Sequence, residues 1–331
     1  MKNNALIRGM GFYGPKKILT NADLERMVDT SDEWITTRTG IKERRMAAPG
    51  EATSDIALQA CKKALADARM APKELTHLIV STLTPDTYCP SSACWLEEKL
   101  GISGDVMAFD VNGACSGFLY GLQTARAMVA LDPEAKVLLT AAENLTSRTN
   151  WEDRATCVLF GDGAGSVVVT GPEKNASGAE ILDVILGSNG KFADLLTVKG
   201  GGSGWQYKLG ERIKEDFFIQ MNGREVFKIA VRIMETISRK MLDKHGILPE
   251  DIDLFVAHQA NLRIITHVGK KLGFPPEKVF VNVDRFGNTS AAAVAIALAE
   301  ARQSGAIRPG NLVLLSTFGG GFTWGSALLQ F

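Results

Sequence analysis

Cys115 is the residue in this chain best placed to do covalent chemistry. It follows an apolar strand predicted over residues 106–111 and the turn Asn112-Gly113-Ala114, and it precedes a helix predicted over 116–130. At a helix N-terminus, unpaired N–H groups and the positive end of the dipole favour a thiolate and can also hold an oxyanion. The position therefore predicts a nucleophile. A buried core cysteine is the alternative that position alone leaves open.

The chain repeats itself at a spacing of roughly 170 to 176 residues, which is close to the size of a domain. Each copy contains a helix, a strand, a second strand that ends in a turn of small residues, a small-residue helix and a third strand. The first copy places them at 54–70, 78–82, 106–111, 116–130 and 137–140, and the second at 223–245, 254–258, 278–283, 290–301 and 312–316. In this alignment His258 matches Thr82, and Asn288 falls one position before the match of Cys115.

Helices that alternate with apolar strands predict an α/β protein whose sheets are covered on both faces. The helices 116–130 and 290–301 are apolar or small nearly all round, so we expect them in the core between two sheets. Their N-termini then meet at one central site, which brings Cys115, His258 and Asn288 together. We predict two similar halves, residues 1–172 with the cysteine and 173–331 with the histidine and the asparagine.

The composition sets outer bounds on function. The 331 residues include 37 basic and 37 acidic side chains, so no global field recruits nucleic acid or a membrane. A signal pattern is not apparent in the first thirty residues, and no apolar run approaches a membrane span, so we expect a cytoplasmic protein. Five cysteines without a pair at metal-ligand spacing argue against a disulfide framework and a metal site.

Four motifs in this order resemble the β-ketoacyl-acyl carrier protein synthase III enzymes of the thiolase-like superfamily. They are Asn112-Gly113-Ala114-Cys115-Ser116-Gly117-Phe118, His258-Gln259-Ala260-Asn261-Leu262-Arg263-Ile264, Gly287-Asn288-Thr289-Ser290-Ala291-Ala292 and Gly319-Gly320-Gly321-Phe322-Thr323-Trp324-Gly325-Ser326. The resemblance runs from Thr20-Asn21-Ala22-Asp23-Leu24 to the last residues. It implies a thiolase-like fold, with two similar α/β halves in a layered α-β-α-β-α arrangement.

The resemblance implies an acyltransferase that starts fatty-acid biosynthesis by decarboxylative Claisen condensation of a short acyl-CoA, such as acetyl-CoA, with malonyl-acyl carrier protein. Cys115 takes the acyl group, and the enolate formed when malonyl loses CO2 attacks it. His258 and Asn288 donate hydrogen bonds to that enolate, while the backbone N–H groups of Cys115 and Gly320 hold the other carbonyl oxygen. No cofactor is implied. The residues alone leave His258 as a structural histidine and Asn288 as a helix cap.

The resemblance also assigns residues to coenzyme A and to a partner subunit. The adenine lies between Trp34 and Arg154, and the path to the site is lined by Thr30, Arg38, Gly223, Phe227 and Asn261. In the family, the residue matching Cys89 closes the acyl pocket of the partner in a homodimer. Acetyl-selective members carry Phe there, so Cys89 predicts that propionyl and butyryl groups are also accepted. A bulky neighbour such as Tyr88 that fills the same space is the alternative.

Acyl carrier protein is acidic as a family, so a chain without net charge needs a local basic patch to bind it. Arg224, Lys228 and Arg232 recur every four residues on one helical face. The patch is predicted to comprise Lys228, Arg263, Lys270 and Lys271. An ordinary solvated helix face has the same pattern and is the alternative.

Rival functions differ at identifiable residues. A thiolase carries a second cysteine in its C-terminal glycine-rich turn, whereas residues 158–331 contain none. Elongating condensing enzymes pair two histidines, whereas the second donor here is Asn288. A condensing or acyl-transfer enzyme of specialised metabolism with the same Cys/His/Asn set stays open, as does a non-catalytic acyl-binding module. Residues 197–218 predict a long loop near the substrate entrance.

Overall fold

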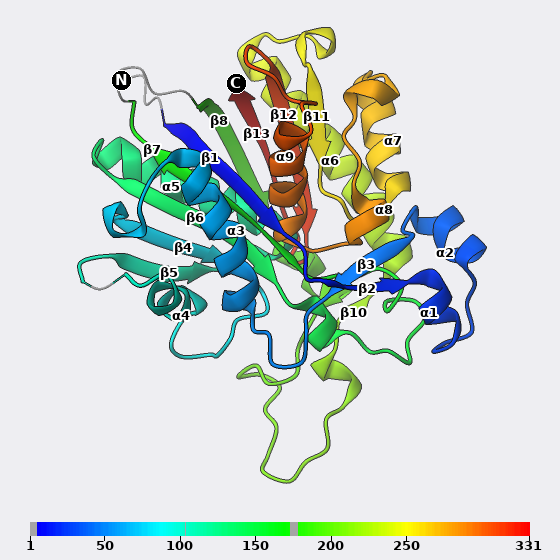
Figure 1. Cartoon of the computed structure of the whole chain (residues 1–331). Helices are drawn as coiled ribbons and strands as arrows, with labels where there is room; N and C mark the ends of the chain where they lie inside the picture. The colour runs from blue at the N-terminus through cyan, green and yellow to red at the C-terminus, as the bar shows by residue number, and fades with distance from the viewer. Residues whose placement is uncertain (1–4, 103, 173–177) are drawn as a thin grey trace.

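The computed structural model describes residues 5–102, 104–172 and 178–331, so the predicted boundary between residues 172 and 173 lies at the edge of a segment outside the described residues. Its centre is a nine-stranded sheet in the order β11-β12-β13-β8-β1-β7-β6-β4-β5 (Figure 1). The strands are β1 (Leu6–Tyr13), β4 (His77–Ser81), β5 (Met107–Val111), β6 (Lys136–Glu143), β7 (Gly163–Thr170), β8 (Ala179–Ser188), β11 (Leu254–Ala257), β12 (Leu312–Gly319) and β13 (Thr323–Gln330). A small hairpin pairs β2 (Lys17–Thr20) with β3 (Glu43–Met46).

The repeat predicted from the sequence is visible in the strand order. One half reads β5-β4-β6-β7-β1, and the other reads β11-β12-β13-β8, which is the same order without a counterpart of β5. In both halves the first strand after the long helix pairs in parallel with the next long strand, with Leu78 opposite Leu138 and Leu254 opposite Val313. Two antiparallel residue pairs between β1 and β8, Leu6 with Glu180 and Ile7 with Ala179, connect the sheets of the two halves.

Helices fill the centre and cover both outer faces. The buried helices α5 (Gly117–Leu131) and α9 (Ala292–Gln303) share one apolar core with strands of both halves. The outer face of the first half is covered by α3 (Thr53–Ala68) and α4 (Ser92–Lys99), and that of the second by α6 (Gly223–His245) and α7 (Leu262–Leu272). This is the predicted α-β-α-β-α arrangement. At one edge of the molecule lie the short helices α1 (Asn21–Glu25) and α2 (Asp32–Thr39).

The predicted strand over 278–283 is wrong. Lys278 ends a 3-10 turn (Pro276–Lys278), Val283 begins the short helix α8 (Val283–Phe286), and between them Val279 forms an isolated parallel bridge with Phe255. The side chain of Gln259 takes the backbone groups that a ladder would use. Its Oε1 accepts from the N–H groups of Asn282 and Val283, and its Nε2 donates to the Phe280 carbonyl.

The predicted loop at residues 197–218 leaves the sheet between two short strands, β9 (Leu196–Thr197) and β10 (Gln220–Met221), which pair with each other. It projects from the body of the protein at the bottom of Figure 1. Near its start it meets the segment before α4, because a Cβ added at Gly201 would lie 2.8 Å from the hydroxyl of Tyr88. Within the described ranges, no helix has the length and apolarity needed to cross a bilayer.

Candidate active site

Cys115 lies in a tight turn that the second half of the chain holds in place. A short 3-10 turn at Ala114–Ser116 connects β5 to α5, and Ala114 has a φ of 47°, in the left-handed region. A Cβ added at Gly319 would lie 2.5 Å from the backbone nitrogen of Cys115, so a glycine is required for this approach. The Thr323 hydroxyl donates to the Gly113 carbonyl at 2.8 Å. The end of β12 and the start of β13 therefore position the turn.

The sulfur of Cys115 is buried, and burial raises the pKa of the thiol to about 11. The Ser290 hydroxyl and the backbone N–H groups of Gly320 and Cys115 oppose this shift, and the Glu143 carboxylate adds to it. Burial therefore works against the predicted thiolate and the hydrogen-bond donors work for it, so the thiolate stays a prediction. The two N–H groups predicted to hold a carbonyl oxygen do lie beside the sulfur.

His258 follows β11, and its N–H donates to the Ser316 carbonyl at 2.8 Å. The ring is 3% exposed, and burial lowers the pKa of the imidazole to about 4. The side chain is therefore neutral at neutral pH, with one nitrogen that donates and one that accepts. Nδ1 is buried without a hydrogen-bond partner. A structural histidine would have a protein partner at Nδ1, and His258 lines the cavity described below, so it suits a residue whose partner is a ligand.

Asn288 is fixed by the backbone of residues 159–161. Its N–H donates to the Leu159 carbonyl at 2.8 Å, and its carbonyl accepts from the Gly161 N–H at 3.1 Å. The side-chain oxygen accepts from the Ser290 N–H at 2.9 Å, so the amide N–H groups are the part that can donate to a ligand. Because α9 begins at Ala292, Asn288 stabilises the turn before the helix and does not serve as its N-cap.

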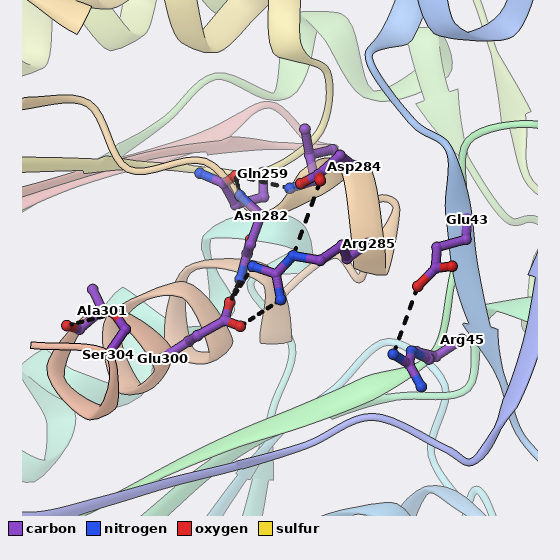
Figure 2. A network of polar contacts seen from close by, with 10 residues as sticks. Glu43, Arg45, Gln259, Asn282, Asp284, Arg285, Glu300, Ala301 and Ser304 are labelled. Atoms are coloured by element: carbon purple, nitrogen blue, oxygen red, sulfur yellow. Dashed lines mark hydrogen bonds and ion pairs between the residues drawn. The ribbon is translucent and has the colours of Figure 1, made fainter. Parts of the chain in front are cut away.

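A polar network ties His258 to the helix that follows Asn288. Gln259, the next residue, accepts from the backbone N–H of Asn282 at 2.9 Å, and the Asn282 amide donates to Glu300 on α9 at 2.8 Å. Arg285 donates to both oxygens of Glu300, at 2.6 and 3.0 Å (Figure 2). The network joins residues from three separate parts of the chain, so no local sequence pattern predicted it.

Two cavities meet at Cys115. The larger, of about 530 Å³, is lined by Cys115, His258 and Asn288, and also by four of the residues assigned to coenzyme A, namely Arg38, Gly223, Phe227 and Asn261. Among its described lining residues Arg38, Arg224, Lys228 and Arg263 are basic and none is acidic. The smaller, of about 190 Å³, is mainly apolar and is lined by Leu83, Leu145, Phe160, Leu196, Val198 and Ile219 together with Asn112, Ala114, Cys115, Thr197, Ser290 and Gly320.

The two residues predicted to sandwich an adenine are stacked on each other. The guanidinium carbon of Arg154 lies 4.6 Å from the centre of a Trp34 ring, and that of Arg38 lies 4.8 Å from it. Arg154 also donates to the Asp29 carbonyl at 2.7 Å. The hydroxyl of Thr30 is buried and has no partner. In this structure the Arg154 guanidinium thus lies against the ring where the adenine is predicted to stack.

The predicted basic patch divides into two parts. Lys228 and Arg263 are exposed and line the larger cavity, with the Arg263 guanidinium 5.5 Å from the Phe227 ring. Lys270 and Lys271 lie in the last turn of α7, about 11 Å along the helix axis from Arg263 at 1.5 Å per residue. Lys271 forms an ion pair with Glu235 at 2.9 Å.

Cys89 is exposed and lies outside the described linings of both cavities. It belongs to the segment between β4 and α4, where Tyr88 is 79% exposed. The structure therefore does not bring Cys89 to the site of its own chain.

Comparison with known proteins identifies the family. Residues 109–190 match the 3-oxoacyl-[acyl-carrier-protein] synthase III model, and residues 242–331 match its C-terminal model. A β-ketoacyl-[acyl-carrier-protein] synthase III of Nitratidesulfovibrio vulgaris is 56% identical over the whole of both chains. The crystal structure of the Aquifex aeolicus protein, 47% identical, covers 99% of this chain and 100% of its own with a TM-score of 0.89. That from Thermus thermophilus, 44% identical, covers 98% of both with a TM-score of 0.89. This chain therefore belongs to the β-ketoacyl-[acyl-carrier-protein] synthase III family.

Proposed function

We propose that this protein initiates fatty-acid biosynthesis by condensing a short acyl-CoA, such as acetyl-CoA, with malonyl-acyl carrier protein, with loss of CO2. One observation carries the proposal. Cys115, His258 and Asn288 line a single cavity, and the backbone N–H groups of Cys115 and Gly320 lie beside the sulfur. A nucleophile, two neutral donors and an oxyanion hole are the groups that both half reactions require.

In the first half reaction, the sulfur of Cys115 attacks the thioester carbon of the acyl-CoA and loses its proton to solvent, from which the departing thiolate of coenzyme A takes one. The N–H groups of Cys115 and Gly320 stabilise the negative oxygen of the tetrahedral intermediate. The bond to coenzyme A then breaks, and the thiolate of coenzyme A leaves. The acyl chain remains on Cys115, in the apolar cavity of about 190 Å³.

In the second half reaction, malonyl-acyl carrier protein loses CO2, and negative charge moves onto its thioester oxygen. The His258 ring and the Asn288 amide donate hydrogen bonds to that oxygen. His258 can act as a neutral donor because burial holds the pKa of its imidazole at about 4. Each such donor is worth about 3 kcal/mol of barrier. The enolate carbon attacks the acyl group, and Cys115 leaves as the thiolate.

The larger cavity suits the phosphates of coenzyme A and an acidic carrier protein, because its described lining residues include basic side chains and no acidic ones. We assign the adenine to the space between Trp34 and Arg154. Lys228 and Arg263 are the part of the basic patch that we assign to the carrier protein at the mouth of the cavity. Lys270 and Lys271 extend the patch along α7. The reaction needs no cofactor, since coenzyme A arrives with the acyl group.

We also propose a cytoplasmic homodimer that pairs through β5. This strand is the last in the sheet and so offers an unpaired edge, and Met107 within it is 56% exposed. Tyr88 and Trp95, on the segment and helix before β5, are 79% and 36% exposed. A partner at this edge would cover these side chains and would bring Cys89 near the acyl cavity of the other subunit.

The experiment that tests the proposal is transfer of a labelled acetyl group from acetyl-CoA to the protein. The unmodified protein is expected to take one label per chain on the peptide that contains Cys115, and Cys115→Ala none, with an unchanged unfolding temperature. Cys94→Ala is the matched control, because Cys94 is exposed on α4, and it should label normally. Label on Cys61, Cys94 or Cys157, with activity lost on their alkylation, would overturn the assignment.

A further inference from the structure

Arg44 is a fully buried cation that the mechanism above does not use. It lies in β3, has no exposed surface, and is outside the described linings of both cavities at Cys115. Within the described residues, the hydrogen bonds that its guanidinium donates all go to neutral oxygens. Burying a charged group is costly, so the groups that it binds indicate its role.

The guanidinium of Arg44 joins two separate parts of the chain. Nη1 donates to the Leu19 carbonyl at 3.1 Å and to Oδ1 of Asn21 at 2.9 Å. Asn21 is itself buried, and its amide donates to the Ile41 carbonyl at 2.8 Å. Nη2 donates to the Val158 carbonyl at 2.8 Å. One side of the fork is therefore anchored in the segment before β3, and the other side holds the chain at residue 158.

The residues that follow Val158 fix the position of Asn288. Phe160 and Asn288 form an isolated parallel bridge, in which Asn288 donates to the Leu159 carbonyl at 2.8 Å and accepts from the Gly161 N–H at 3.1 Å. Residues 159–161 belong to no helix or strand, since β7 begins only at residue 163. The sheet therefore does not hold this segment, and other contacts must.

Both ends of the segment are held by β3. At one end the Arg44 side chain binds the Val158 carbonyl. At the other end the Asp162 N–H donates to the Arg45 carbonyl at 2.9 Å, and the Asp162 carboxylate accepts from the Ala47 N–H at 2.7 Å. Arg44 supplies the side-chain half of this clamp.

The aliphatic stem of Arg44 packs against both sides of the bridge. A Cβ added at Gly161 would lie 3.0 Å from the Cβ of Arg44, and one added at Gly287 would lie 3.1 Å from it. Gly287 directly precedes Asn288 and has a φ of 63°, so packing must restrict a backbone that is intrinsically free. Arg44 thus contacts the segment that holds Asn288 and also the residue that leads into it.

The position of Asn288 matters because two donors must reach one enolate oxygen. A donor stabilises that oxygen fully only when it lies about 2.7 to 3.1 Å from it. His258 is held within the second half of the chain, because its N–H donates to the Ser316 carbonyl. Asn288 is held by the first half, through the segment that Arg44 clamps. The Cys115 turn is positioned separately, by the end of β12 and the start of β13.

We propose that Arg44 is a positioning residue for malonyl decarboxylation. By clamping residues 158–161 it sets the place of the Asn288 amide relative to the His258 ring. The inference rests on the role proposed above for Asn288. Arg44 touches no substrate, so its replacement should lower the rate of decarboxylation and leave the binding of malonyl-acyl carrier protein unchanged. Acylation of Cys115 does not use Asn288 and should be spared.

The test is the release of labelled CO2 from malonyl-acyl carrier protein by Arg44→Lys, which keeps the charge and most of the stem but lacks the planar fork. We expect kcat to fall about 10- to 10²-fold, less than for a donor lost outright. KM and acetyl transfer to Cys115 should stay within about threefold. Arg45→Lys is the matched control on the same strand. The Arg45 side chain pairs with Glu43 at 3.7 Å (Figure 2), so this variant should keep the unmodified kcat.

A double variant separates positioning from general loss of structure. If Arg44 acts through Asn288, Arg44→Lys should cost less than about threefold in kcat in an Asn288→Ala background. A second variant, Asp162→Asn, loosens the other end of the segment and should show the same loss of decarboxylation with acylation spared. An unfolding temperature is measured for every variant.

Three results would overturn the inference. They are an unmodified kcat in Arg44→Lys or in Asp162→Asn, an equal loss of acylation and decarboxylation, and a full loss on adding Arg44→Lys to Asn288→Ala. Normal decarboxylation by Asn288→Ala alone would instead overturn the role proposed for Asn288 in the reaction.

Discussion

Replacing Asn288 with aspartate is expected to abolish malonyl decarboxylation while leaving acylation of Cys115 largely intact. Aspartate has the same shape, and one of its oxygens can still accept from the Ser290 N–H, as the amide oxygen does at 2.9 Å. The turn before α9 should therefore hold. What the variant loses is the amide nitrogen, which is the donor proposed for the enolate oxygen.

The size of the effect follows from the lost donor and the added charge. One lost donor costs about 3 kcal/mol, or 10² to 10³ in rate. The introduced aspartate and a full enolate charge about 3 Å away would repel by roughly 5 kcal/mol at an effective dielectric of 20. In the transition state the enolate is about half formed, so the repulsion is about half of that. Asn288→Ala should thus lose about 10²- to 10³-fold and Asn288→Asp about 10⁴-fold.

The assay separates the two half reactions. Release of labelled CO2 from malonyl-acyl carrier protein measures decarboxylation. Transfer of a labelled acetyl group from acetyl-CoA measures acylation of Cys115. An unfolding temperature for each variant controls for loss of the turn. The reasoning fails if Asn288→Asp decarboxylates within tenfold of the unmodified protein, if it is faster than Asn288→Ala, or if acylation falls as far as decarboxylation does.

Two further predictions concern the partners. Arg263→Glu should raise the KM for malonyl-acyl carrier protein about tenfold and make this KM less dependent on salt, because a charge at the cavity mouth steers an acidic partner. Lys73→Glu, in the other half of the chain, is the control. Equal effects of the two variants would mean that Arg263 is an ordinary surface residue. The unmodified protein should use propionyl- and butyryl-CoA at rates comparable to acetyl-CoA, and Cys89→Phe should narrow it to acetyl by about 0.8 kcal/mol per excluded CH2. Strict acetyl selectivity before the change, or the same chain-length profile after it, would remove Cys89 from the acyl pocket.

The sequence was enough to identify Cys115, His258 and Asn288 as one group, because the repeat aligns their elements and the structure has them on one cavity. The helix predicted at 223–245 has the observed bounds. A helix or strand can be predicted from the sequence because its periodicity is local. The proximity of helix ends that are distant in the sequence could be predicted because the same pattern of elements occurs twice.

The failures share a physical cause, since each depends on groups distant in sequence. The strand expected at 278–283 is absent because the side chain of Gln259 takes its backbone hydrogen bonds. Burial of Cys115, which raises the pKa of its thiol, is likewise a contribution that a helix-terminus argument does not include.

The isolated bridge between Phe255 and Val279 bears on how copies of this chain can associate. A sheet with two open edges can add subunits at both and grow without limit. Here the β11 end is closed off, because the 279–283 segment lies against it and Gln259 occupies the backbone groups of that segment. The β5 end keeps an open edge. In the proposed homodimer, pairing of this edge with its own copy about a twofold axis would use up both edges, and growth would end at two chains. The absence of a strand at 278–283 would then prevent filaments.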